Sequence, residues 1–289
     1  MAEIRSENKK LSAGLYVVAT PIGNLGDMSK RAQDILAAAD MVACEDTRVT
    51  AKLMSAFLLK NTLIPYHEHN GATQRPKILA KIREGGAVVL VSDAGTPLIS
   101  DPGYKLVEEA HAEGLKVVAI PGPSALIAAL SLAGLPTNKF TFLGFPPNKS
   151  KARKDWFHEQ QANTGTLVFY ESAKRLPACL ADGATVLGDR QAAVCRELTK
   201  KFEEVVKDDL FGLANRYASS GPPKGEIVVV IDGAPKSAPD AGLATEELDR
   251  ALLIALEYMS VKSAAAFVAD FLDVRRKQVY SRALTLSKE

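Results

Sequence analysis

Short apolar runs rich in β-branched residues alternate along the chain with segments whose apolar positions recur at helical spacing. The runs predict buried strands at residues 15–20, 87–92 and 116–120. The segments predict helices at residues 29–39, 102–113 and 123–133. Gly114 and Gly134 follow two of these helices, where a helix end favours a residue that tolerates left-handed geometry. Strands buried on both faces and joined by helices indicate a mainly parallel sheet in an α/β domain.

A second group of elements follows the turn at Gly144-Phe145-Pro146-Pro147. It comprises a polar helix from about 150, a helix after Ser172, and strands at 166–170, 192–195 and 226–231. The Pro, Ala and Gly residues that follow continue neither a strand nor a helix. These changes predict an α/β domain at 1–138, a second α/β domain at 139–232 and a linker at 233–244.

Residues 245–289 predict a small helical unit that resembles a helix-turn-helix. Its helices are expected at 246–259, at 261–272 after a Ser260 N-cap, and at 274–286 after an Asp273 N-cap. The first turn of the last helix carries Arg275, Arg276 and Lys277, where the helix dipole disfavours cations. This turn is either a solvated helix end or a contact for nucleic-acid phosphates.

The composition is that of an ordinary globular protein, with 289 residues, 47% hydrophobic and 24% charged, and a net charge of +2. It excludes a disordered or collagen-like chain. Because there is no uncharged apolar stretch of about 18 residues and the N-terminus is charged, we expect no membrane partner and no export. Three widely spaced cysteines suggest neither disulfides nor a metal site, which fits the cytoplasm.

Several familiar signatures are missing, among them GxGxxG, GxxxxGK[ST], HExxH and GxSxG. Dinucleotide oxidoreductase, P-loop NTPase, zincin and α/β-hydrolase activities therefore lose their main support. His67 and His69 lack further ligands at a usual spacing, so no metal is expected.

Three loops rich in Gly, Pro and small polar residues each follow a predicted strand, at 19–27, 92–103 and 121–125. Ligands bind at the carboxyl ends of the strands in an open α/β sheet, and loops without bulky side chains let the backbone approach them closely. Tight strand-to-helix turns would explain any one of these loops. Together they predict a ligand cleft.

These loops resemble the tetrapyrrole methylase superfamily of S-adenosylmethionine-dependent methyltransferases. More closely, the chain is similar to the bacterial 16S rRNA (cytidine-2′-O)-methyltransferases of the decoding region. The similarity lies in the ordered strings VATPIGNLGD, CEDTR, HEHN, VSDAGTPLISDPG, IPGPSA, LGFPP, FYES, RELTK and KGE. It implies two α/β domains with the cofactor, S-adenosyl-L-methionine, in the cleft between them, a C-terminal helical RNA-contacting unit, and a homodimer.

The resemblance also implies positions for the cofactor. Its amino-acid end would lie near Ala94, Gly95, Thr96, Ile99, Asp101, Ser124 and Ala125. Tyr170, Leu198, Lys224 and Gly225 would wall the adenine side, and Pro21 would line the floor. The Asp101 carboxylate suits the ammonium and sulfonium charges, and a helix N-terminus suits the carboxylate.

Methyl transfer to a ribose hydroxyl also needs a base, and the family strings offer Glu171, Lys200 and Asp46 as catalytic candidates. Glu171 could instead orient its loop, and Asp46 could form an ion pair or a helix cap. Lys200 could act as a base or as a phosphate clamp, and a lysine base needs burial or cationic neighbours.

Basic patches could hold 16S rRNA, which we expect to be presented within the 30S subunit. They lie at Lys149, Lys151, Arg153 and Lys154; at Arg196, Lys200 and Lys201; and at Arg275, Arg276, Lys277 and Arg282. Two alternatives stay open: a methyltransferase for a small tetrapyrrole-like or protein substrate, and a ligand-sensing nucleic-acid-binding regulator.

Overall fold

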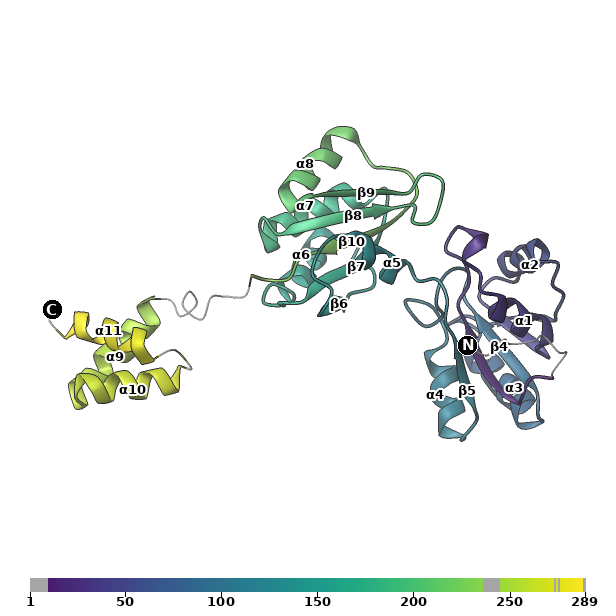
Figure 1. Ribbon diagram of the computed structural model, residues 1–289, viewed down its shortest axis with the longest axis horizontal. Coiled ribbons are helices and arrows are strands. Elements are labelled where there is room, and N and C mark those ends of the chain that lie inside the picture. Colours follow the sequence, from purple (N-terminus) through teal and green to yellow (C-terminus); the bar gives the residue numbers. More distant parts are fainter. Residues whose placement is uncertain (1–9, 236–244, 273, 275, 288–289) are drawn as a thin grey trace, which may run out of the picture. The chain divides into compact units, whose positions relative to one another are not determined.

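The computed structural model describes residues 10–235, 245–272, 274 and 276–287 (Figure 1). The chain divides between Gly233 and Ala234 into two compact units. The first unit holds two five-stranded sheets, and the second is helical.

The first sheet is parallel throughout, in the order β3-β2-β4-β1-β5. Its strands are β1 (Gly14–Val18), β2 (Met41–Cys44), β3 (Leu63–Pro65), β4 (Ala87–Val91) and β5 (Val117–Ile120). Central β4 is wholly buried, and its alternate residues enter two different cores: Val89 and Val91 one, Val88 and Leu90 the other. This burial on both faces confirms the prediction from the apolar runs.

Helices cover both faces of this sheet. They are η1 (Leu25–Asp27), α1 (Lys30–Ala38), α2 (Thr47–Ala56), α3 (Gly71–Arg83) and α4 (Tyr104–Ala112). Helix α1 begins where the Ser29 side chain caps the Ala32 amide, and it buries Ile35 and Leu36 at helical spacing. Helices α1 and α2 pack on the core that contains Val89, and α3 and α4 on the core that contains Leu90.

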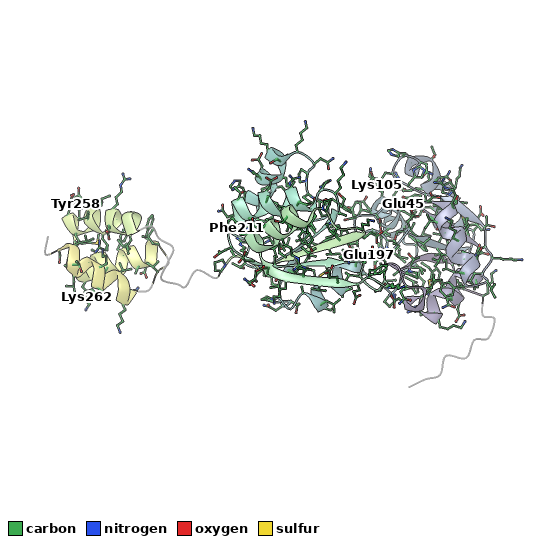
Figure 2. The ribbon with its side chains drawn as sticks, turned by 90° about the horizontal axis from the view of Figure 1, so that it is seen from above. Glu45, Lys105, Glu197, Phe211, Tyr258 and Lys262 are labelled. Carbon is green, nitrogen blue, oxygen red and sulfur yellow. The ribbon has the colours of Figure 1, made fainter. Side chains whose placement is uncertain are left out.

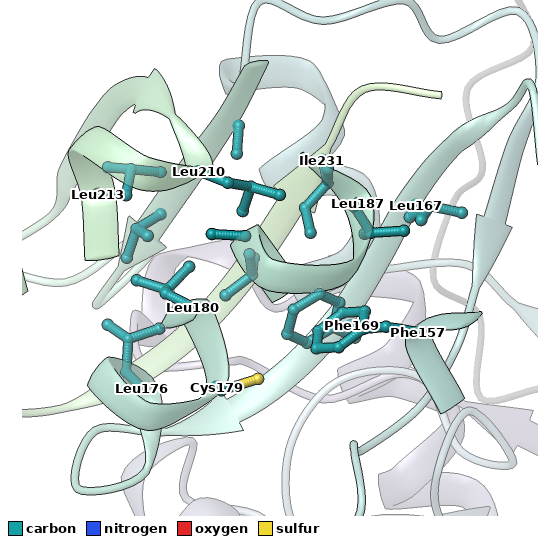
Figure 3. Close-up of a cluster of buried hydrophobic side chains, with 14 of the residues drawn as sticks. Phe157, Leu167, Phe169, Leu176, Cys179, Leu180, Leu187, Leu210, Leu213 and Ile231 are labelled. Atoms are coloured by element: carbon teal, nitrogen blue, oxygen red, sulfur yellow. The ribbon is translucent and has the colours of Figure 1, made fainter. Parts of the chain in front are cut away.

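The second sheet has the order β6-β7-β10-β8-β9 and is mixed: β6 is parallel to β7, and the other neighbours are antiparallel. Its strands are β6 (Phe140–Phe142), β7 (Thr166–Ser172), β8 (Gln191–Arg196), β9 (Glu204–Asp209) and β10 (Glu226–Ile231). One face packs against α6 (Ser150–His158), α7 (Leu176–Leu187) and α8 (Leu210–Ser220). Figure 3 shows this core, in which the Phe157 and Phe169 rings lie together beneath α7.

The other face of the second sheet packs against α5 (Ala125–Leu132). The helix buries Leu126, Ala129 and Leu130 against Val168 and Val228. Although α5 precedes residue 138, its apolar face therefore belongs to the core of the second sheet. The domain boundaries proposed from the sequence stay predictions.

The second unit consists of α9 (Thr245–Tyr258), α10 (Val261–Phe271) and α11 (Arg276–Leu286), drawn in yellow and yellow-green in Figure 1. They enclose a small core that includes Leu252, Val268 and Val279. The predicted Ser260 cap is confirmed, since its hydroxyl accepts from the Ser263 amide at 3.3 Å. The predicted Asp273 cap and Arg275 lie outside the described residues.

The predicted α/β fold class with a C-terminal helical unit is confirmed. No element is predicted for residues 40–86, where the structure has β2, α2, β3 and α3, nor for β6, β9 and α8. Strand β9 is almost entirely exposed and depends on its pairing with β8, so its residues show no buried alternation. No helix in the described ranges combines the length and apolar composition needed to cross a membrane.

Candidate functional site

A cavity of about 670 Å³ lies in the first unit, at the carboxyl ends of the first sheet's strands and against the second sheet. The first sheet contributes Ile22, residues 93–96 and 99–101, and Ser124 and Ala125 at the start of α5. The second sheet and its loops contribute Phe145, residues 170–173, Arg175, Leu198 and residues 225–228. Figure 2 labels Glu45 and Glu197 where the two sheets adjoin.

Backbone hydrogen bonds bring the three predicted loops together. Thr20 and Gly95 exchange two of them, at 2.8 and 3.0 Å, and the Thr96 hydroxyl donates to the Pro123 carbonyl at 3.0 Å. Gly95 has φ +78°, and a Cβ there would lie 3.3 Å from the Ile22 side chain. The first loop therefore packs closely on the second, and the predicted convergence of the loops is present.

Left-handed backbone is concentrated in the loops around the cavity. Outside glycine it occurs, within the described residues, at Leu58 and at four positions in two of these loops: Leu98, Ser100, Glu197 and Thr199. Such conformations cost about 1–3 kcal/mol each and persist only where surrounding contacts enforce them. The two loops are therefore held in shapes that the chain would not adopt alone, which is typical of a ligand site.

One side of the cavity is acidic. Burial raises the pKa of the Asp101 carboxyl; a hydrogen bond with Ser92 opposes this rise, and Asp93 adds to it. Burial also raises the pKa of Glu45, and the charges of Asp93 and Asp101 raise it further. Three carboxyl groups thus repel one another beside a loop of small residues. A cationic group bound there would relieve the repulsion.

The start of α5 offers the opposite electrostatics. Ser124 is its N-cap residue, and within the described residues its side chain makes no capping hydrogen bond. Ser124 and Ala125, at the start of this eight-residue helix, line the cavity, and a helix N-terminus favours an anion. The acidic side chains and the helix N-terminus on the first-sheet side of the cavity therefore fit a ligand that carries both a positive and a negative charge.

Glu171 lines the cavity, but its carboxyl group is already engaged. Its side chain is fully buried and accepts hydrogen bonds from the Ser172 amide at 2.7 Å and from Arg175 Nη2 at 3.0 Å. Arg175 also donates to the Pro146 carbonyl at 2.5 Å. Glu171 therefore fixes Arg175, and through it the loop that follows β6.

Lys200 packs beside the first loop, over Gly23, and the described residues that line the cavity do not include it. Its Nζ lies 2.9 Å from Glu197 Oε1 and 2.8 Å from Glu226 Oε2. Burial would lower the pKa of Lys200, but hydrogen bonds to the two glutamates outweigh burial and raise it. This geometry disfavours Lys200 as a base and leaves the phosphate clamp.

Asp46 is the N-cap residue of α2, and among the described residues it does not contribute to the lining. Its side chain accepts from the Arg48 amide at 2.8 Å and forms an ion pair with Arg48 Nη2 at 2.6 Å. Hydrogen bonds from the Arg48 side chain and amide lower the pKa of Asp46 to about 2. The geometry is that of the alternative considered for this residue, a helix cap with an ion pair.

Most of the proposed cofactor positions line this one cavity: Ala94, Gly95, Thr96, Ile99, Asp101, Ser124, Ala125, Tyr170, Leu198 and Gly225. Among the described residues, Pro21 and Lys224 do not line the cavity, although their chain neighbours Ile22 and Gly225 do. Sequence reasoning missed Phe145 and Arg175. The LGFPP string pointed to Phe145, whereas no local signal marks Arg175, which reaches the site through partners distant in sequence.

The basic patches are smaller than their sequence suggests. Arg153, expected on an RNA-binding surface, is only 4% exposed, and its Nη2 lies 2.6 Å from Asp182 Oδ2. This expectation is wrong, because the Arg153 guanidinium is buried in an ion pair inside the protein. Arg196 pairs with Glu204, and Arg276 with Asp270. Lys149 and Lys151 are exposed, as expected.

Comparisons with known proteins agree with this architecture. Residues 14–214 match the family described as tetrapyrrole (corrin/porphyrin) methylases, and residues 242–287 match the RsmI C-terminal HTH domain. The chain is 45% identical to ribosomal RNA small subunit methyltransferase I of Mesorhizobium japonicum, over 96% of this chain and 94% of that protein. It is 46% identical to the protein of the same name from Xylella fastidiosa strain Temecula1, over 92% and 97%.

Solved structures show the same fold at low sequence identity. The methyltransferase CobJ superposes with a TM-score of 0.57 at 21% identity, covering 77% of this chain and 95% of that one. A diphthine synthase superposes with a TM-score of 0.54 at 16% identity, covering 75% and 89%.

Proposed function

Because the chain belongs to the tetrapyrrole methylase family and, with its full-length relatives, to the ribosomal RNA small subunit methyltransferase I family, we propose that it transfers a methyl group from S-adenosylmethionine to the ribose 2′-oxygen of a cytidine in the decoding region of 16S rRNA. The observation that carries the proposal is the extent of the likeness, which includes the helical unit. The solved enzymes CobJ and diphthine synthase share the fold but match about three quarters of the chain.

The cavity fits S-adenosylmethionine by its chemistry. The acidic side at Asp101 suits the ammonium and sulfonium charges, and the start of α5 suits the carboxylate. Tyr170 and Leu198 offer an aromatic and an aliphatic wall for the adenine, and the backbone of Gly225 lines the cavity beside them. When bound, the cofactor supplies an electrophilic methyl group, and the protein's part is to hold the 2′-oxygen in line with it.

The nucleophilic hydroxyl must also lose a proton. Of the candidates Glu171, Lys200 and Asp46, only Glu171 is found among the described residues that line the cavity. Its hydrogen bonds to Ser172 and Arg175 orient the carboxyl group, so we propose Glu171 as the base or as the residue that positions it. For Lys200 we propose the contact with substrate phosphate that its cationic form allows.

The expected activity can be tested with methyl-labelled cofactor and 30S subunits from a strain that lacks the modification. After digestion of the RNA, label is expected in 2′-O-methylcytidine, and methylation should weaken steeply with salt because phosphate contacts release counterions. Subunits from a strain that carries the modification are the control and should take no label. If the protein binds the cofactor but labels no rRNA, the assignment is wrong, and a small-substrate or sensor function gains support.

We also propose that the protein is a homodimer, located in the cytoplasm with its ribosomal substrate. The outer face of α5 and the start of β6 expose Ile127, Leu132 and Phe140. A hollow of about 360 Å³ lies among Ile127, Leu130, Leu135 and Phe140, so this face offers apolar surface for a second copy.

Light scattering after gel filtration should give twice the chain mass of 30.9 kDa. Phe140→Asp is expected to shift the protein toward monomer, because it places a charge in the apolar contact. Phe211→Asp alters an exposed phenylalanine on α8 and serves as the matched control. A monomeric wild type, or a Phe140→Asp variant that stays dimeric, would contradict the proposed interface.

A further inference from the structure

Phe145 is an aromatic side chain left open at the cavity. It follows β6, lines the cavity and is 59% exposed. Its ring meets Tyr170 edge to face, with centroids 5.4 Å apart, and Tyr170 meets Phe142 in the same way at 5.0 Å. One part of the Phe145 ring is therefore supported by aromatic packing while the rest stays accessible.

The loop that carries Phe145 is fixed by two arginines. The Tyr170 amide donates to the Gly144 carbonyl at 2.8 Å, and Arg175 donates to the Pro146 carbonyl and to Asn148 Oδ1. Arg153 Nη1 donates to the Pro147 carbonyl at 3.4 Å and to the Asn148 carbonyl at 3.3 Å.

The two guanidinium groups are in turn held by Glu171 and Asp182. Two consecutive prolines further restrict the loop. The exposed ring is thus presented by a rigid segment, which lowers the entropy lost when a partner binds it.

A loop of the first sheet lies beside Phe145 at the cavity. A Cβ on Gly144 would lie 3.7 Å from Ser100 Oγ, so the loop before Phe145 packs directly on the loop that carries Ile99. Ile99 also lines the cavity and is partly exposed. The ring of Phe145 therefore belongs to the side of the cavity near Ser100, whereas Leu198 and Gly225 come from other loops of the second sheet.

We propose that Phe145 stacks on the base of the nucleotide whose ribose is methylated. This inference rests on the proposed rRNA activity and adds a residue to it. If the ribose is to enter the cavity, its own base must lie within one nucleotide of the opening, where this ring is accessible. Unpaired RNA bases stack on aromatic side chains, and a flat, pre-positioned ring needs no rearrangement to accept one.

Phe145→Ala should lower kcat/KM for 30S subunits by about 5- to 150-fold, the range for loss of one base–aromatic stack. Phe145→Trp should keep most of the activity, because it restores a stacking surface. The dissociation constant for S-adenosylmethionine, measured by calorimetry without RNA, and the unfolding temperature should stay near the wild-type values. Phe211→Ala, which removes a phenylalanine that is 49% exposed on α8, is the matched control and should leave kcat/KM unchanged.

The measurements separate failure of this inference from failure of the proposed function. If wild-type protein methylates 30S subunits and Phe145→Ala does so equally well, the stacking role is wrong. If Phe145→Ala weakens S-adenosylmethionine binding as much as it lowers kcat/KM, the ring belongs to the cofactor's wall and the inference is overturned. If the wild type itself does not methylate 30S subunits, the proposed function fails and the stacking role fails with it.

Discussion

Replacing Arg153 with alanine is expected to lower the free energy of unfolding by about 3–5 kcal/mol. Arg153 Nε and Nη2 donate to Asp182 Oδ2 at 2.8 and 2.6 Å, and both side chains are buried between α6 and α7. Removal of the guanidinium leaves the buried Asp182 carboxyl with only the more distant Lys154 Nζ, at 3.7 Å, and the Ser150 hydroxyl as partners. It also removes the hydrogen bonds to the carbonyls of Pro147 and Asn148, so methylation should fall as well.

Trp156 makes this effect measurable, because it is the single tryptophan of the chain and packs on Phe157 and Phe169 in the same core. Urea unfolding followed by its fluorescence reports on the second sheet. The control is Arg48→Ala. Arg48 also lies 2.6 Å from an aspartate, Asp46, but its side chain is 86% exposed, so little change is expected.

A double variant, Arg153→Met with Asp182→Leu, should recover most of the lost stability, because no unpaired charge remains. Equal free energies of unfolding for Arg153→Ala and Arg48→Ala would show that the buried ion pair of Arg153 contributes no more stability than an exposed one.

Asp101→Asn is expected to weaken S-adenosylmethionine binding by about 10- to 100-fold, the usual weight of a hydrogen bond to a charged group. The substitution keeps the shape of the side chain and removes the negative charge that suits the cofactor's cationic groups. Calorimetry with the purified protein measures the change. Asp27→Asn, in the exposed turn η1, is the matched control and should bind as the wild type does. An unchanged affinity in Asp101→Asn would remove Asp101 from the cofactor site.

The pH dependence follows from the raised pKa values of Asp101 and Glu45. Both groups take up protons at a pH above their usual range, so affinity for a cationic ligand should fall as the pH is lowered through the raised pKa values. Asp101→Asn should flatten this dependence.

For the ligand-free protein the sign is opposite. The folded state binds more protons than the unfolded state between the usual and the raised pKa, so stability decreases as pH rises through that interval. At neutral pH, Asp101→Asn should therefore unfold no more easily than the wild type. A large loss of stability would mean that Asp101 supports the fold instead of a ligand.

Local pattern was sufficient for most of the strands that are buried on both faces, although it missed β2. The apolar run at 226–231 has the same bounds as β10, and the predicted ends at Gly114 and Gly134 coincide with positive φ. The convergence of three loops was also predictable, because parallel strands place their carboxyl ends at one edge of a sheet. The exposed strand β9 was not predictable from the sequence, because it is a strand through its pairing with β8 and its own residues show no strand periodicity.

The sequence by itself therefore determined the α/β class, the family, and about half of the residues that line the cavity. Only the tertiary structure decided what the charged residues do. Arg153 meets Asp182 across 29 positions, and Lys200 meets Glu226 across 26. The charges and burial around a cationic side chain decide whether it is free to contact RNA, is buried in an ion pair, or stays protonated and so cannot act as a base. Those surroundings are set by contacts between distant segments, which no local pattern of hydrophobic and polar positions records.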